Sequence, residues 1–306
     1  MLANLHEMFY QWFIRKLYLR DVSLYFPIMS NAPEYLNFAY PDFSVQYFVS
    51  TFRPGKITLE GKIPRSKLHF FSITLYGVDG LPIYSKSDAD LSTSYVETVD
   101  LDVVAALIVR FYRKDPKESF ENYLPTLSVA KKEVTRSARL AASKKLEKLL
   151  LPKIAKQNIR IAEILPTEPQ FFKPNDQMLK SLFPNPFAHY LIARPSNQQG
   201  YIDITTPSFS MDDYRFVGFM VSNYSTTETD DSISLSGNRR YRIWFGVGPP
   251  DKHMKYYLQW KSSNAFPILV YREVRIKKLG LAKHKIMLGP TQLKRIMNYP
   301  EIHYFK

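Results

Sequence analysis

The expected fold is decided by two stretches of similar character, HFFSITLY (His69–Tyr76) and YRFVGFMV (Tyr214–Val221). Both are runs of aromatic and β-branched residues, and the first is followed by Val78-Asp79-Gly80, a turn of the hairpin type. Such runs, bounded by turn residues, are typical of strands that are buried in a sheet. The chain is therefore expected to be organised around two buried strands, one in each half.

Further strands are predicted on both sides of these two stretches. In Lys56–Lys62, apolar or small residues alternate with charged and polar ones, as in a strand with one buried face. The 21 Tyr and 21 Phe favour β structure, and a hydrophobic content of 45% is enough for a large core. The other predicted strands are 44–52, 107–112, 187–193, 201–205, 241–247, 256–260 and 267–274.

The two halves resemble each other in sequence. Tyr47 and Tyr190 precede the two key strands, and an Arg-containing strand closes each half: Val109-Arg110-Phe111 and Val270-Tyr271-Arg272. Because a repeat with a period of about 145 residues is too long for a solenoid, it predicts two similar domains. The expected fold class is mainly β, with two related antiparallel β-sandwich units of jelly-roll type, a helical insertion and an N-terminal amphipathic helix.

Changes in composition divide the chain into five segments. An irregular connection rich in Pro, Asn and Tyr follows the first helix, and Asp115-Pro116 is a typical helix start. The predicted segments are an N-terminal helix and linker (1–40), a first β unit (41–114), a basic helical insertion (115–165), a second β unit (166–280) and a C-terminal tail (281–306).

The second half resembles a β-sandwich domain of unknown function that is found in bacteria and in some large DNA viruses. The resemblance rests on Phe171-Phe172-Lys173-Pro174, on Leu182-Phe183-Pro184-Asn185-Pro186, and on a strand like "R-Y-W-S-F-T-L-Y" at Tyr214–Phe219. The stretch His69–Tyr76 matches this strand as well, so the resemblance implies a duplicated sandwich. It implies no activity, because the family has none assigned.

Two segments outside this resemblance are candidate partner-binding sites. Residues 2–17 have the apolar spacing of an amphipathic helix, which would pack on its own domain, dock into a neighbouring subunit or lie on a membrane interface. The region from Leu127 to Arg160 has ten basic residues against two Glu, as on a solvated helix face or a phosphate-binding one. The predicted docking residues are Leu5, Phe9, Trp12 and Phe13, and the predicted contacts to an anionic partner are Lys131, Lys132, Arg136, Arg139, Lys144, Lys145 and Lys148.

Composition limits the partners and the chemistry. The net charge of +14 favours an acidic protein, a nucleic acid or an anionic membrane face as partner, although it also suits a merely solubilising surface. The absence of Cys excludes disulfides, thiolate metal sites and a Cys nucleophile. No apolar run is long enough to span a bilayer, and charged residues interrupt the N-terminus where a signal peptide would be apolar. The expectation is an intracellular or virion protein without a cofactor.

The sequence has no familiar catalytic motif. It lacks a phosphate-binding Gly-rich loop, a G-x-S-x-G elbow and an H-E-x-x-H zinc motif. The carboxylate pairs Asp88/Asp90 and Asp212/Asp213 fit turns better than a metal site. The candidates for an enzyme or small-ligand site at the mouth of the sandwich are Asp88, Asp90, His69 and Arg110.

Three functional hypotheses follow. The first is a non-catalytic structural or interaction protein that docks into a larger assembly, such as a minor capsid component of a large DNA virus; the virus is an analogy from fold. The second is an enzyme or small-ligand binder at the sandwich mouth. The third is a nucleic-acid binder without sequence preference that uses the basic insertion.

Overall fold

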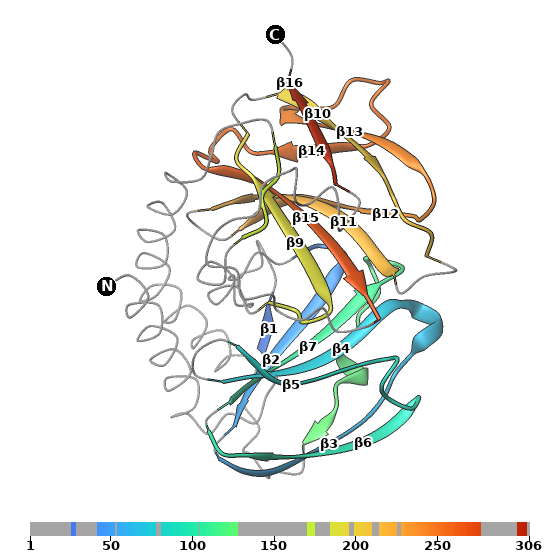
Figure 1. The fold of residues 1–306 in the computed structure, drawn as a ribbon, viewed down its shortest axis with the longest axis vertical. Helices are drawn as coiled ribbons and strands as arrows, with labels where there is room; N and C mark the ends of the chain where they lie inside the picture. Colours follow the sequence, from blue (N-terminus) through green and yellow to red (C-terminus); the bar gives the residue numbers. More distant parts are fainter. Residues whose placement is uncertain are drawn as a thin grey trace. The chain divides into compact units, whose positions relative to one another are not determined.

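A computed structural model provides the structure of the chain (Figure 1). The described residues are 26–28, 42–52, 54–77, 81–103, 105–127, 170–174, 184–195, 199–209, 214–224, 228–276 and 299–304. They form two compact units. Unit 1 comprises residues 1–145 and 177–186, and unit 2 comprises 146–176 and 187–306.

Unit 1 contains two sheets. The first has the strand order β1-β2-β7-β4-β5, and the second has the order β6-β3-β8. All pairs of neighbouring strands in both sheets are antiparallel. The strands are β1 (Phe26–Ile28), β2 (Val45–Phe52), β3 (Gly55–Lys62), β4 (Leu68–Tyr76), β5 (Pro82–Ser87), β6 (Ser94–Leu101), β7 (Ala105–Arg113) and β8 (Thr126–Leu127).

Unit 2 also contains two sheets. The first has the order β12-β11-β15-β9, and the second has the order β14-β13-β10-β16. All pairs are antiparallel except β13 with β14, which run parallel. The strands are β9 (Ala188–Ala193), β10 (Gln199–Thr205), β11 (Tyr214–Asn223), β12 (Thr229–Leu235), β13 (Arg240–Val247), β14 (Tyr257–Trp260), β15 (Pro267–Arg275) and β16 (Glu301–Tyr304).

The strand orders of the two units correspond. Six strands of each unit have the same positions in their sheets. They pair, unit 1 with unit 2, as β2 with β9, β3 with β10, β4 with β11, β5 with β12, β6 with β13 and β7 with β15. The central pairs also share an irregularity, because the register shifts after Leu68 in β4 and after Tyr214 in β11. By these registers, Arg110 lies opposite Ser72 in unit 1, where Arg272 lies opposite Gly218 in unit 2.

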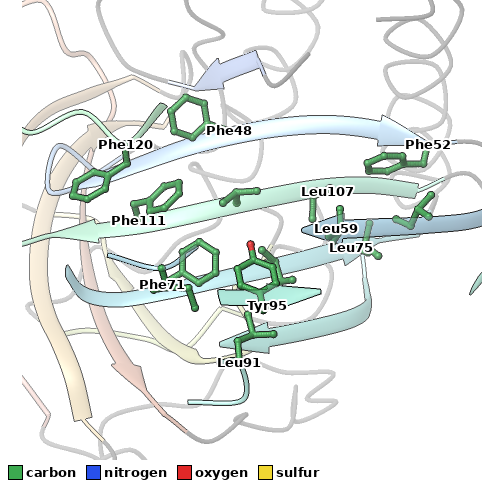
Figure 2. Packing of buried hydrophobic residues seen from close by; sticks show 14 of the residues in the cluster. Phe48, Phe52, Leu59, Phe71, Leu75, Leu91, Tyr95, Leu107, Phe111 and Phe120 are labelled. Atoms are coloured by element: carbon green, nitrogen blue, oxygen red, sulfur yellow. The ribbon is translucent and has the colours of Figure 1, made fainter. Parts of the chain in front are cut away.

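The core of unit 1 lies between its two sheets, as in a β-sandwich (Figure 2). Phe48, Phe71 and Phe111 of the first sheet form one buried cluster with residues of the second sheet, and Phe71 contacts Tyr95 with ring centroids 6.2 Å apart. Phe111 is in the centre of this cluster, where it stacks on Phe120 at 5.3 Å and contacts Phe71 at 5.1 Å between ring centroids. Burial of these large rings provides most of the stabilisation that a sandwich gains from its core.

The core of unit 2 is built in the same way. Phe219 and Tyr271 of the first sheet face Ile243 and Phe245 of the second, and all four are buried. Trp260 stacks on Phe245 with ring centroids 5.8 Å apart. The stretches that the sequence analysis placed at the centre of the fold, in β4 and β11, are therefore central strands whose inward residues fill the two cores.

The prediction of a mainly β fold is confirmed, and the described residues include no α-helix. Strands β1, β5, β6, β8, β12 and β16 were not predicted; β1 lies in the segment that was expected to be an irregular connection. The helix predicted to begin at Asp115-Pro116 is wrong for residues 115–127. Asp115 instead closes a turn, because its carboxylate accepts a hydrogen bond from the Lys117 backbone N–H (2.9 Å) and its carbonyl accepts one from Glu118 (3.1 Å). A 3₁₀ turn (Glu121–Tyr123) and β8 follow.

Candidate functional site: an aromatic face of unit 2

One side of the β14-β13-β10-β16 sheet carries a row of four aromatic side chains. Their positions in the four strands are in register: His303 pairs with Tyr201, Tyr201 with Trp244, and Trp244 with Tyr257. Their neighbours along the strands, such as Ile202, are buried in the core, so the row lies on the outer side of the sheet. All four side chains are partly exposed. We call this side the aromatic face; it consists of Tyr201, Asp203, Arg242, Trp244, Tyr257 and His303.

The middle of the aromatic face is fixed by stacking. The rings of Tyr201 and His303 are nearly parallel, at 20°, with centroids 4.7 Å apart. The Arg242 guanidinium lies over the Tyr201 ring at 4.2 Å, and Trp244 contacts Tyr201 at 5.3 Å. These contacts are cross-strand neighbours, which hold one another in a defined orientation.

A polar row runs beside the aromatic one. Arg242 donates two hydrogen bonds to Asp203, each 2.8 Å long, and Asp203 lies 4.0 Å from His303. Hydrogen bonding from Arg242 lowers the pKa of Asp203 and raises that of Arg242. Asp203 also pairs in register with Glu301 of β16. The face therefore presents fixed ions next to aromatic rings, which is a composition typical of binding surfaces.

The corresponding face of unit 1 has a different composition. Its outward pairs join Lys56 to Asp100, Thr58 to Thr98 and Glu60 to Val96, and none of these residues is aromatic. Thr58 and Thr98 share a hydrogen bond of 3.1 Å, and Val96 is 63% exposed. Since the same sheet position needs no aromatic residue in unit 1, the aromatic row of unit 2 is not a requirement of the sandwich.

A second group of ionisable residues lies inside unit 2, at one end of β15. Glu273 is fully buried, and both of its carboxylate oxygens accept hydrogen bonds, one from the Tyr271 hydroxyl at 2.9 Å and the other from Arg275 at 2.8 and 2.6 Å. The Arg275 guanidinium also lies 4.4 Å from the centre of the Tyr214 ring. The equivalent of Glu273 in unit 1, by register, is Phe111.

Burial dominates the electrostatics of this group. Desolvation raises the pKa of Glu273, although Arg275 and the Tyr271 hydroxyl oppose the change. Desolvation also raises the pKa of Tyr271. His189 pairs in register with Glu273, and burial together with the charges of Arg275 and Lys173 lowers its pKa to about 4. Because both carboxylate oxygens of Glu273 accept hydrogen bonds, Glu273 and Arg275 form a structural ion pair.

The residues proposed for a sandwich-mouth site have separate roles. Asp90 accepts hydrogen bonds from the N–H (2.8 Å) and hydroxyl (3.0 Å) of Ser87, and thus shapes the turn after β5. Asp88 accepts one from the Phe71 N–H at 3.3 Å and pairs with Arg65 at 3.8 Å.

The other two candidates are in the first sheet. His69 lies at the register shift of β4, and burial and Lys114 lower its pKa. Arg110 is buried and donates a hydrogen bond to the Tyr76 hydroxyl at 2.8 Å. Asp90 therefore serves the turn, whereas Asp88 connects this turn to β4 and to Arg65. Arg110 serves the packing of β7.

Pro184 and Asn185 belong to a segment that carries the resemblance to the β-sandwich family, and they have a defined role in unit 1. The Tyr76 hydroxyl donates a hydrogen bond to the Pro184 carbonyl at 2.9 Å, and the Asn185 amide donates one to the Tyr112 hydroxyl at 3.1 Å. Asn185 is fully buried. These bonds connect a segment distant in sequence to the ends of β4 and β7, so the motif has a structural reason.

Several predicted sites lie outside the described residues. They include the docking residues Leu5, Phe9, Trp12 and Phe13, the basic residues from Lys131 to Lys148, and the pair Asp212/Asp213. Within the described part of the chain, no three His, Asp or Glu residues gather closely enough to hold a metal ion. None of the described helices could span a membrane.

Comparison with known proteins supports the fold. No protein-family model matches the chain, and no curated protein matches its sequence. A solved structure of an uncharacterised protein from Burkholderia cenocepacia is similar with a TM-score of 0.58 and 12% identity, over 91% of this chain and 81% of that chain. A protein from Vibrio parahaemolyticus is similar with a TM-score of 0.50 and 10% identity, over 98% of this chain and 96% of that chain. At these identities, the likeness concerns the fold alone.

Proposed function

We propose that the protein is a non-catalytic interaction protein in which two duplicated β-sandwich units form the frame and the aromatic face of unit 2 binds the partner. The observation that carries the proposal is the contrast between the outer faces of the two units. Tyr, Trp and Arg are the residues that contribute most to binding at protein surfaces, and they lie together in unit 2. The equivalent face of unit 1 has Lys, Thr, Glu and Val in their place.

Duplication is part of this proposal and is supported by the common strand order of the two units. A second support is the pair of buried arginines. Arg110 pairs in register with Tyr47 of β2, and Arg272 pairs in register with Tyr190 of β9. Each guanidinium lies over a tyrosine ring, at 5.6 Å over Tyr76 and at 5.3 Å over Tyr190. Membership of the bacterial and viral family of β-sandwich domains belongs to the same proposal, and the two similar bacterial structures agree with it in fold.

The test is co-purification from the native source, followed by measurement of the native mass of the complex. The variant Tyr201→Ser/Trp244→Thr gives the aromatic face the character of the unit 1 face and is expected to lose the partner. The matched control is Thr98→Ala on the face of unit 1, which is expected to keep it. Loss of the partner in both variants, or in neither, would contradict the role of the aromatic face.

The other hypotheses remain separate proposals. A nucleic-acid-binding role would use Lys131, Lys132, Arg136 and Arg139, and would show a steep dependence of affinity on salt concentration. An enzyme or small-ligand binder at the mouth of the sandwich stays a prediction, whose candidate residues are Asp88, Asp90, His69 and Arg110. The virus-particle assignment stays a prediction, to be tested by mass spectrometry of purified particles.

A further inference from the structure

We propose that the aromatic face binds a neutral, linear oligosaccharide, whose chain runs across the strands along the row His303–Tyr201–Trp244–Tyr257. This inference rests on the proposed function, because it names the ligand class of the same surface. It depends on three observations: the length of the aromatic row, the polar side chains on both sides of it, and the balance of charge.

The row has the dimensions of a short sugar chain. Its four rings come from four neighbouring strands in strict register, from His303 in β16 to Tyr257 in β14. Because adjacent strands are 4.7–4.9 Å apart, the row extends over about 14 Å, the length of about three pyranose rings. A sugar ring has an apolar side formed by its C–H groups, and this side packs against the faces of aromatic rings. Because His303 and Arg242 already stack on the Tyr201 ring, Trp244 is the ring expected to receive it.

Hydrogen-bonding groups lie on both sides of the row. On one side, Asp203 pairs in register with Arg242 and with Glu301. On the other side, the register places Gln199 and Gln259 on either side of Gly246. Carboxylates, guanidinium and amides together offer both donors and acceptors, as vicinal hydroxyl groups require.

The stacking within the face prepares it for binding. Tyr201 is fixed by His303 at 4.7 Å and by Arg242 at 4.2 Å, and Arg242 is fixed in turn by two hydrogen bonds to Asp203. Little side-chain entropy is therefore lost when a ligand binds. Trp244 is the partly exposed ring at the centre of the row, next to Tyr201 and Tyr257, and it is expected to contribute most of the stacking.

The charge of the face favours a neutral ligand over nucleic acid. Although the whole chain has a net charge of +14, strands β10, β13 and β16 carry two basic residues on this face, Arg240 and Arg242, against Asp203 and Glu301. The formal charge of these four residues is zero, and the exposed Lys255 before β14 adds a single positive charge, so the face has few cations to neutralise phosphates. A proline-rich peptide could also pack on a row of rings, but it has few hydroxyl groups for the polar rows.

The experiment is isothermal titration calorimetry of the full chain with cellohexaose, maltohexaose, xylohexaose and chitohexaose. An oligothymidylate and a proline-rich peptide serve as the competing ligand classes. At least one hexasaccharide is expected to bind, with an affinity that is nearly constant between low and high salt. Trp244→Ala is expected to weaken this binding about tenfold or more, whereas Trp244→Phe keeps much of it.

Controls separate folding from binding. Thr98→Ala on the corresponding face of unit 1 should leave saccharide binding unchanged, and the urea midpoint of each variant shows whether it is folded. Absence of binding by all four saccharides overturns the inference, as does binding that is the same in folded Trp244→Ala. Preference for the oligothymidylate or for the peptide also overturns it. If Tyr201→Ser/Trp244→Thr loses the assembly partner but no saccharide binds, the interaction function stands and only the ligand class is wrong.

Discussion

Acid is expected to destabilise unit 2 through one residue, His189. Its side chain is largely buried, opposite Glu273 in the register and close to the positive charges of Arg275 and Lys173. These surroundings lower the pKa of His189 from 6.5 to about 4 in the folded protein. In the unfolded chain the same imidazole takes up a proton near pH 6.5.

The sign and size of the effect follow from this difference. When the pKa of a base is lower in the folded protein than in the unfolded chain, the unfolded chain binds the proton first as the pH falls. The free energy of unfolding is therefore full above pH 6.5 and decreases as the pH falls toward 4. At about 1.4 kcal/mol for each pH unit, the loss between pH 7 and pH 4.5 is about 2.5 kcal/mol. The raised pKa of Glu273 acts in the opposite direction, because its contribution to the free energy of unfolding falls as the pH rises.

The matched variant is His189→Gln, since Gln46 occupies the corresponding place in β2, opposite Phe111. Urea unfolding at pH 7 and at pH 4.5 gives the free energy of unfolding of each protein at each pH. Between these pH values, wild type should lose about 2.5 kcal/mol more than His189→Gln does. His253→Gln, at an exposed turn, should behave like wild type. If wild type and His189→Gln lose the same free energy, His189 is not the group responsible.

Four more substitutions test the packing. Arg110→Ala and Arg272→Ala should each lower the free energy of unfolding by about 2–4 kcal/mol, because each removes a buried guanidinium that packs on tyrosine; a cost in only one unit would contradict equivalent roles. Gly200→Ala should displace β16, since a Cβ there would lie 2.4 Å from the His303 carbonyl oxygen, and hydrogen exchange in residues 301–304 should rise. Tyr76→Phe should cost about 1–3 kcal/mol by urea unfolding, because Arg110 and the Pro184 carbonyl both lose the hydroxyl; an unchanged midpoint would show that neither bond matters.

Much of the sheet structure could be predicted from the sequence because buried strands are apolar. The stretches in β4 and β11 have long aromatic and β-branched runs, and β3 alternates clearly. The missed strands are more polar: β12 begins with Thr229-Asp230-Asp231, which is not an apolar run. In the structure, Asp231 accepts a hydrogen bond from the Gln259 N–H at 2.9 Å and Asp230 one from Asn264 at 2.7 Å, so both carboxylates tie β12 to β14 and the turn after it.

The candidate site could not be predicted in the same way. Each ring of the aromatic row lies in a different strand, and Tyr201 and His303 are about a hundred residues apart, so only the register of the sheet brings them together. Of two tryptophans in this sheet, Trp260 lies in the core and Trp244 is partly exposed, and their types do not distinguish them in the sequence. Glu273 could have been found, because it shares the inward parity of Leu269 and Tyr271 in a predicted strand.

The position of β16 has a consequence for how the protein is made and handled. Its four residues, Glu301–Tyr304, complete a sheet whose other strands end by Trp260. The row of aromatic rings can therefore form only after residues 301–304 have been translated. A product that is shortened before these residues would leave one edge of β10 unpaired. Affinity tags intended for work on this surface belong at the amino-terminal end of the chain, far from β16 in sequence.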